Sequence, residues 1–207
     1  MKLYYGSRRY SVRESYRITV DGWRTVRFLI RARRSGELSG PFMERLMLAV
    51  TQVNGCALCA WGHTRAALES GMSGEEVRAL LGGDLERVPP DEVAAVLFAQ
   101  HYADTRGRPS PHAWQRLLDL YGAPGAAAIL GAIRMIMIGN VYGIAGGAML
   151  DRLRRRPDTH SSPAYEVAMI ASAAVVLPLA FAHAGLATLA GQPLIAFAPP
   201  LPSAEMS

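Results

Sequence analysis

Apolar residues recur along most of the chain at the three- and four-residue spacing of an amphipathic helix. The first such run covers residues 19–34, where Trp23, Val26 and Ile30 share one side and arginines occupy the other. No stretch alternates between apolar and polar residues with a period of two, so no strand is predicted. The pattern predicts an all-α fold, with further helices at residues 42–53, 56–70, 89–103, 110–120 and 126–150, and a short one that opens at residue 73.

Helix-ending and capping signals fix several of these boundaries. Asn54 and Gly55 form a good helix terminator, so Cys56 lies at or near the start of the next helix. Ser73 and Glu76 have the spacing of a capping box, which starts another short helix. Helices joined by such short turns are expected to pack side by side.

Charge is concentrated at the beginning of the chain. Residues 1–34 hold ten basic and two acidic side chains, a charge of +8, so the net charge of +5 leaves −3 for the remainder. A basic arm of this kind can meet nucleic acid, anionic lipid or an acidic partner. Because no helix-turn-helix pattern, zinc-finger spacing or aromatic RNA-binding motif accompanies it, we expect no nucleic-acid partner.

An apolar extension occupies the other end of the chain. Residues 167–190 carry no formal charge and are long enough to cross a hydrocarbon core of about 30 Å at about 1.5 Å per residue. The basic run 152–156 precedes them, as positive charge precedes a spanning helix on the cytoplasmic side. Against this, Pro178, His183 and Gly185 interrupt the run. The sequence leaves two alternatives, a membrane anchor or a helical hairpin buried in an oligomer.

The chain has only two cysteines, Cys56 and Cys59. Secreted scaffolds usually need several cysteines that close long loops, whereas a lone Cys-x-x-Cys is typical of redox chemistry or of part of a metal site. The first residues have no apolar run after their charges, unlike a signal peptide. We therefore expect a cytoplasmic protein, with the membrane alternative placing it on the inner face of the cell membrane.

Four residues form a candidate site. Cys56, Cys59 and His63 lie at positions i, i+3 and i+7, on one face of the same predicted helix. The helix start and the imidazole both favour thiolate, and two thiols one turn apart can close a disulfide. Glu44 lies on the preceding helix, which a short turn folds back, so its carboxylate can reach and orient His63. The spacing suits two-electron redox chemistry.

These residues can also have purely structural roles. The cysteines can be two small buried residues of the core, and Glu44 taken alone can be a solvated helix residue. Structural zinc needs a fourth ligand, and the chain supplies no second cysteine pair and no histidine at ligand spacing, so no metal is predicted. Trp61 lies on another face of the helix, where we expect core or subunit packing.

The motif Glu44-x11-Cys56-x2-Cys59-x3-His63 resembles that of the AhpD-like alkylhydroperoxidases, within the carboxymuconolactone decarboxylase superfamily. The segments MERLMLAVTQVNGCALCAWGHTRAALESGMSGEEVRALLGG and DEVAAVLFAQHYADTRGRP are similar to the family core, and the likeness spans about residues 37–150. It implies an antiparallel helical bundle that forms a homo-oligomer, with the site near a subunit contact. The implied domains are a basic arm (1–36), an AhpD-like core (37–158) and an apolar extension (159–207).

The resemblance also implies an activity. In such enzymes the second cysteine, here Cys59, meets a hydroperoxide or a partner disulfide, and Cys56 resolves the adduct. Glu44 and His63 would form a proton relay, a dithiol donor would restore the pair, and no cofactor or metal would be needed. One departure stands out, because the antioxidant members carry a second histidine where this chain has Leu58.

Two other functions stay open at this point. The first is a decarboxylase-type lyase or an isomerase acting on a small carbon acid, with His63 as general base. The decarboxylase branch lacks the cysteine pair, which argues against it. The second is a redox-responsive module that binds a membrane or a partner through a surface set by its disulfide state.

Overall fold

The structure is a computed structural model that describes residues 8–197, and within that range it is built of helices without a strand. The predicted all-α fold is confirmed. Lys2 of the basic arm and the end of the apolar extension lie outside the described residues. The helices are α1 (Val12–Ser35), α2 (Gly40–Asn54), α3 (Ala57–Glu69), α4 (Gly74–Leu81), α5 (Val93–Asp104), α6 (Pro111–Leu153) and α7 (Pro163–Leu189).

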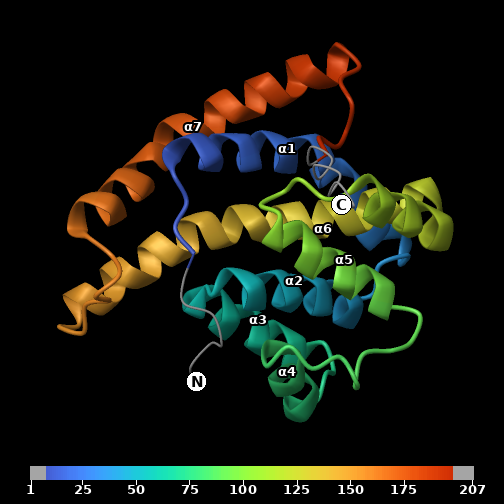
Figure 1. Ribbon diagram of the computed structural model, residues 1–207, viewed down its shortest axis with the longest axis horizontal. Coiled ribbons are helices and arrows are strands. Elements are labelled where there is room, and N and C mark those ends of the chain that lie inside the picture. The colour runs from blue at the N-terminus through green and yellow to red at the C-terminus, as the bar shows by residue number, and fades with distance from the viewer. Residues whose placement is uncertain (1–7, 198–207) are drawn as a thin grey trace, which may run out of the picture.

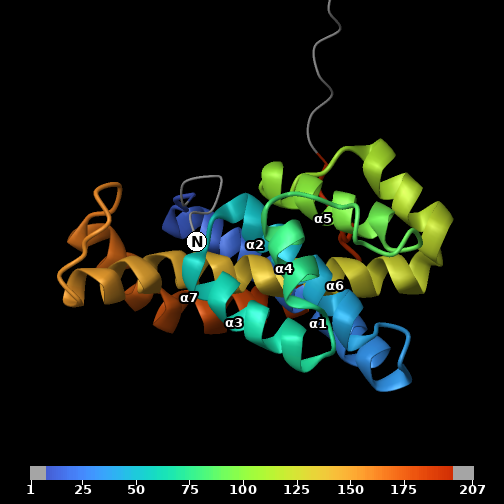
Figure 2. The same cartoon turned by 90° about the horizontal axis from the view of Figure 1, so that it is seen from below.

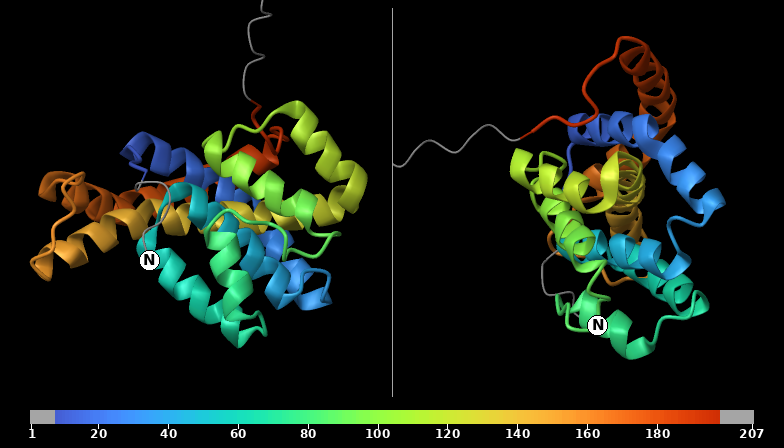
Figure 3. Two further views of the ribbon diagram at one scale, coloured as in Figure 1. Left: turned by 60° about the horizontal axis from the view of Figure 1, so that its bottom comes forward. Right: turned by 90° about the vertical axis from the view of Figure 1, so that its right-hand side faces the viewer.

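The long helix α6 runs through the middle of the molecule (Figure 1) and packs against α1, α2, α3, α5 and α7. Its central apolar side chains Ile133, Met137 and Val141 are almost completely buried. Helices α1 and α7 cover one side of α6, and α2 to α5 cover the other (Figure 3). The core therefore lies around α6, and helices from the beginning, the middle and the end of the chain pack against it.

Helix α1 begins earlier than the sequence pattern predicts. It starts at Val12 and not near residue 19, because Ser11 and Glu14 form a complete capping box. The Ser11 hydroxyl accepts from the Glu14 backbone N–H, and the Glu14 carboxylate accepts from the Ser11 backbone N–H. Farther along, Leu29 and Ala32 belong to the main buried core. The basic helix thus has one face inside the fold.

Helix α6 joins the two helices predicted at 110–120 and 126–150. Gly122 interrupts it with φ 65° and ψ 170°, a backbone conformation that glycine adopts without steric cost. The chain changes direction there, so the first part of α6 lies beside α5 (Figure 2). Phe98 of α5 and Trp114 of α6 pack with ring centroids 6.0 Å apart.

The α2–α3–α4 region is fixed by one turn and one buried arginine. Gly55 ends α2 with φ 72°, and its N–H donates to the Thr51 carbonyl at 2.9 Å, as the terminator signal predicts. Arg45 of α2 donates to the carboxylates of Glu76 and Glu92, each at 2.7 Å. Glu76 is therefore engaged by Arg45, while the Ser73 hydroxyl caps α4 by accepting from the Glu76 N–H.

Helix α7 runs alongside α1 (Figure 1), and Val20 of α1 packs against Ala180 and Ala184 of α7. Both α6 and α7 are long and apolar enough to cross a membrane, by length and composition alone. They differ in burial, because 72% of the most apolar window of α6 is buried against 22% for α7. Helix α6 is thus a core helix in this fold, whereas α7 leaves most of its apolar surface exposed.

Candidate active site

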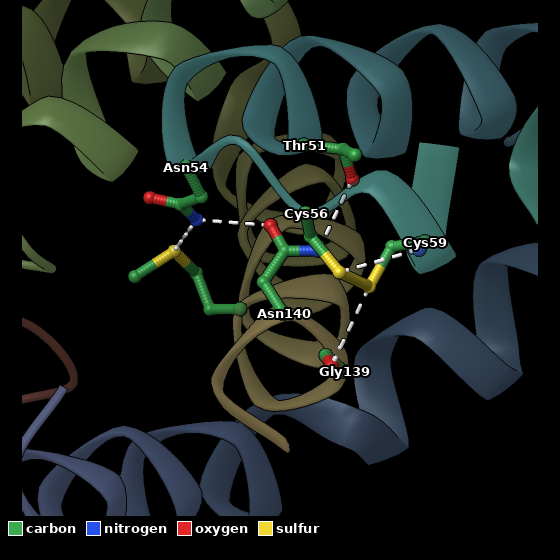
Figure 4. Close-up of a disulfide and its surroundings, with 7 residues drawn as sticks. Thr51, Asn54, Cys56, Cys59, Gly139 and Asn140 are labelled. Atoms are coloured by element: carbon green, nitrogen blue, oxygen red, sulfur yellow. Dashed lines mark hydrogen bonds between the residues drawn. A yellow bond between two sulfur atoms is a disulfide. The ribbon is translucent and has the colours of Figure 1, made fainter. Parts of the chain in front are cut away.

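Cys56 and Cys59 form a disulfide at the start of α3, with their Cα atoms 5.3 Å apart (Figure 4). Cys56 is the N-cap residue of α3, and its Sγ accepts a hydrogen bond from the Cys59 backbone N–H at 3.2 Å. Cys56 is completely buried, whereas Cys59 is partly exposed. The two sulfurs therefore differ in both access and electrostatic environment.

The position of Cys56 favours negative charge on its sulfur. The first backbone N–H groups of a helix have no partner within the helix and carry a partial positive charge. Cys56 Sγ already accepts from one of them. When the disulfide opens, these groups stabilise a thiolate on Cys56, the sulfur that solvent cannot reach.

Glu44 and His63 form a hydrogen-bonded pair across the α2–α3 contact. The His63 Nδ1–H donates to Glu44 Oε2 at 2.8 Å, and the side chains are 8% (Glu44) and 26% (His63) exposed. This burial excludes the solvated role that Glu44 would have as an isolated helix residue. The carboxylate fixes the ring orientation and leaves Nε2 on the side away from Glu44. Among the described residues, no hydrogen bond joins His63 to either sulfur.

Helix α6 forms the floor beneath the disulfide. Cys59 Sγ lies 3.6 Å from the Gly139 carbonyl oxygen (Figure 4), within reach of an S–H donor once the pair is reduced. A Cβ atom at Gly143 would lie 2.6 Å from Cys59 Sγ and 2.9 Å from Cys56 Sγ, which is too close for either contact. Glycine at position 143 therefore leaves the space that the two sulfurs occupy.

A buried hydrogen-bond network lies beside the disulfide (Figure 4). The Asn54 amide donates to Asn140 Oδ1 at 2.9 Å, and the Asn140 amide donates to Thr51 Oγ1 at 3.2 Å. The Tyr10 hydroxyl donates to Asn54 Oδ1 at 2.7 Å, and burial raises the pKa of Tyr10 to about 12, which keeps it a neutral donor. The network ties the end of α2 to α6 next to the cysteines.

Sequence reasoning missed Gly139, Gly143 and this network. A signal for the glycines was present, because Gly139, Gly143 and Gly147 recur every four residues and so share one face of α6. Nothing in the local sequence, however, indicated that this face meets the cysteines.

A pocket of about 520 Å³ opens next to Gly143. Leu58, Trp61 and Gly147 line its apolar part, and Leu58 is 40% and Trp61 69% exposed. Trp61 is thus no core residue within this chain, contrary to one of its two expected roles. Charged side chains, Arg154 among them, stand at its edge. Across residues 8–197, no group of three or more histidine, cysteine or acidic side chains is arranged to hold a metal ion.

Fold and site together define an all-helical protein with a thiol–disulfide pair at a helix start and a carboxylate–imidazole pair beside it. Residues 19–103 match the model of the carboxymuconolactone decarboxylase family, to which this segment is therefore similar. The match begins within α1, ends within α5 and contains all four predicted site residues. No curated protein and no solved structure matches the chain.

Proposed function

We propose that this protein is a thiol-dependent oxidoreductase in which Cys59 reacts with an organic hydroperoxide and Cys56 resolves the product. The observation that carries the proposal is the contrast between the sulfurs. Cys59 is partly exposed, whereas Cys56 is buried and accepts a hydrogen bond from the start of α3. An accessible nucleophile paired with a buried, stabilised thiolate suits an oxidise-and-resolve cycle.

In the oxidative half-reaction the Cys59 thiolate attacks one peroxide oxygen, and the O–O bond breaks. The alkoxide takes a proton and leaves as the alcohol, while Cys59 becomes a sulfenic acid. The Cys56 thiolate then attacks the Cys59 sulfur, and the S–O bond breaks. Hydroxide leaves as water after protonation, and the disulfide forms.

In the reductive half-reaction a dithiol donor attacks the accessible Cys59 sulfur. The S–S bond breaks and Cys56 departs as a thiolate, a good leaving group because the α3 N-terminus stabilises it. The second thiol of the donor then attacks the mixed disulfide, which releases Cys59 and leaves the donor oxidised. The donor gives two electrons to the cysteine pair, and the reduced pair later passes these two electrons to the peroxide.

The role of Glu44 and His63 is proton transfer. His63 follows Cys59 by one helical turn, so its ring lies on the same side of α3. Glu44 holds Nδ1 protonated and leaves Nε2 to take a proton from the Cys59 thiol and deliver it to the departing alkoxide. Both residues thereby act on the reacting atoms through one imidazole.

The pocket supports an apolar substrate. Leu58 and Trp61 line the pocket next to Gly143, the residue against which both sulfurs pack, and Leu58 stands where the antioxidant family members carry a second histidine. An organic hydroperoxide buries apolar surface against these side chains, which hydrogen peroxide cannot do. We therefore propose a bulky organic hydroperoxide as the substrate class, and a partner disulfide as the alternative electron acceptor.

Thiol counting tests the proposal. The fully reduced protein should lose two thiols on addition of one equivalent of cumene hydroperoxide, without intermolecular bonds, and should turn over when dithiothreitol is supplied. Cys56→Ser should retain one oxidation and leave a sulfenic acid on Cys59 that dimedone traps, whereas Cys59→Ser should be inert.

Four results would contradict it in whole or in part. Dimedone labelling of Cys56 in Cys59→Ser would reverse the roles of the cysteines. Loss of two thiols without turnover would favour a redox-responsive binding module, and no loss at all would favour lyase or isomerase chemistry with His63 as general base. Faster reaction with hydrogen peroxide than with cumene hydroperoxide would overturn the substrate class alone.

A further inference from the structure

Helix α7 has two faces of different character. Its inner side packs on α1 through small residues, and Val176, Ala180 and Ala184 are buried there. Figure 3 shows α7 at the edge of the molecule, with α1 between it and the body of the protein. We call its exposed large apolar side chains the outer face of α7: Val167, Ile170, Val175, Leu179, Phe181, Leu186 and Leu189.

This outer face offers hydrocarbon and almost no hydrogen-bonding group. Between residues 167 and 189 the helix has three polar side chains, and each has a partner within the molecule. The hydroxyls of Ser172 and Thr188 donate to helix carbonyls at 2.7 Å, and His183 Nδ1 lies 2.8 Å from the Tyr16 hydroxyl. Such a surface suits lipid, where an unsatisfied polar group is costly.

The ends of α7 are fastened to the rest of the fold. At its start, Glu166 accepts two hydrogen bonds from Arg152 of α6, at 2.7 and 2.9 Å. After its end, Arg24 donates to the carbonyls of residues 192 and 193, and Arg134 donates to the carbonyl of Leu194 at 2.8 Å. Arg134 is 1% exposed, so a helix that left the body to span a bilayer would strip a buried cation of an acceptor.

Exposed arginines precede α7 in the chain and lie on the face of α1 that contacts it. The exposed Arg155 and Arg156 lead into α7, whereas Arg154 lines the pocket beside α3. On α1, Val20 and Trp23 contact α7, and Arg27 follows them by seven and four residues, which places it on the same face of α1. The exposed side chain of Ile30, seven residues after Trp23, lies on the same face of α1.

We propose that the outer face of α7 lies in the plane of an anionic lipid surface, with these arginines against the headgroups. The apolar side chains would enter the headgroup–acyl boundary along a helix about 40 Å long, while the ends of α7 stay fastened to the body. A second copy of the chain is the other occupant to consider. Protein interfaces usually carry about one hydrogen bond per 100–200 Å², and this face offers almost none, which favours lipid.

Vesicle flotation of the full chain tests this. We expect binding to phosphatidylcholine vesicles that contain phosphatidylglycerol, weaker binding to phosphatidylcholine alone and release at high salt or in alkaline carbonate. Leu179→Glu with Leu186→Glu should weaken binding at least about tenfold, because two charges then face the bilayer. Leu97→Glu with Leu120→Glu is the matched control, since these leucines are 48% and 58% exposed on α5 and α6, and it should bind as wild type.

Each contrary outcome overturns the proposal in a recognisable way. A full chain that stays unbound with phosphatidylglycerol vesicles at low salt excludes lipid. Sedimentation that shows a dimer converted to a monomer by the Leu179→Glu, Leu186→Glu variant, without vesicle binding, assigns the face to a second copy. Resistance to alkaline carbonate assigns α7 as a spanning helix. Circular dichroism of each variant establishes that it is folded, and hydroperoxide turnover is an independent readout.

Discussion

Gly143 is the residue at which α6 meets both sulfurs. Any side chain there competes with the disulfide for the same space, because a Cβ would approach each Sγ within 3 Å. The reduced thiols can rotate away from such a Cβ, whereas the disulfide cannot. Position 143 therefore controls the balance between the oxidised and reduced forms of the pair.

Gly143→Ala should make the disulfide easier to reduce. Overpacking costs about 1–3 kcal/mol, which for a two-electron couple corresponds to a potential raised by roughly 20–65 mV. Redox titration in glutathione buffers measures the shift. Gly147→Ala is the control, since a Cβ there would lie 3.6 Å from the Leu58 Cβ, an ordinary contact, and should leave the potential unchanged. Equal potentials in the two variants would disprove the role of Gly143.

Glu44→Gln and His63→Ala test the proton relay. We expect His63→Ala to slow hydroperoxide-driven thiol loss about 10²-fold near neutral pH and Glu44→Gln to slow it less. The double variant should be no slower than His63→Ala, because both residues act through one imidazole. Stopped-flow thiol loss gives the rates, and exposed Glu69→Gln should match wild type. Additive losses would mean that the two residues act separately.

The chemistry of the site was largely predictable from single residues. Glu44, Cys56, Cys59 and His63 fall on two consecutive helices joined at Gly55, so helical periodicity and one turn suffice to bring them together. The contacts of Gly143 and Asn140 with this site were not predictable, because both residues lie more than 75 residues farther along the chain. The spacing of the glycines and the lone polar Asn140 in an apolar helix are visible in the sequence, but neither indicates which distant element they meet.

At the scale of elements, the junction of α6 and α7 depends on one buried carboxylate. The Glu166 side chain is 1% exposed, and its hydrogen bonds with Arg152 hold the pKa of Glu166 below its ordinary value. A lowered carboxyl pKa stabilises the fold above the unfolded-state pKa of about 4.3, and this contribution is lost as the pH falls through the folded-state pKa.

Glu166→Gln should therefore lower the unfolding midpoint at pH 7, and its difference from wild type should shrink at pH 3, below the unfolded-state pKa of the group. Thermal unfolding of both proteins at the two pH values measures the difference. Arg65 and Glu69 form an exposed i,i+4 pair on α3, so Glu69→Gln should change the midpoint little at either pH. A difference between wild type and Glu166→Gln that persists unchanged at pH 3 would show that the charge is not responsible.

Element boundaries followed local signals where these were strong. The Gly55 terminator is confirmed, and only the Ser73 half of the predicted Ser73–Glu76 capping box forms, because the Glu76 carboxylate accepts from Arg45. The start of α1 was misplaced, since the apolar stripe is weak before residue 19 and the Ser11–Glu14 box was overlooked. The two predicted helices of α6 were correct on either side of Gly122, where only backbone geometry decides between a kink and a loop.

For the whole molecule, composition and periodicity predicted the helical class but not the packing order. The basic arm and the apolar extension looked like separate appendages, yet α1 and α7 pack against each other and against α6. This arrangement depends on contacts between residues far apart in sequence, such as Val20 with Ala180. The division at residues 36 and 158 stays a prediction from the sequence.

Arg134 has a consequence for the order in which the protein can fold during synthesis. Its guanidinium, buried in the middle of α6, donates to the Tyr102 hydroxyl at 2.7 Å and to the carbonyls of Asp21 and Leu194. The ribosome makes the first two acceptors before Arg134 itself, but Leu194 emerges sixty residues later. Until then the buried Arg134 guanidinium of a nascent chain lacks one of its three hydrogen-bond acceptors. The hydrogen bonding of the interior is therefore complete only after Leu194 has been synthesised.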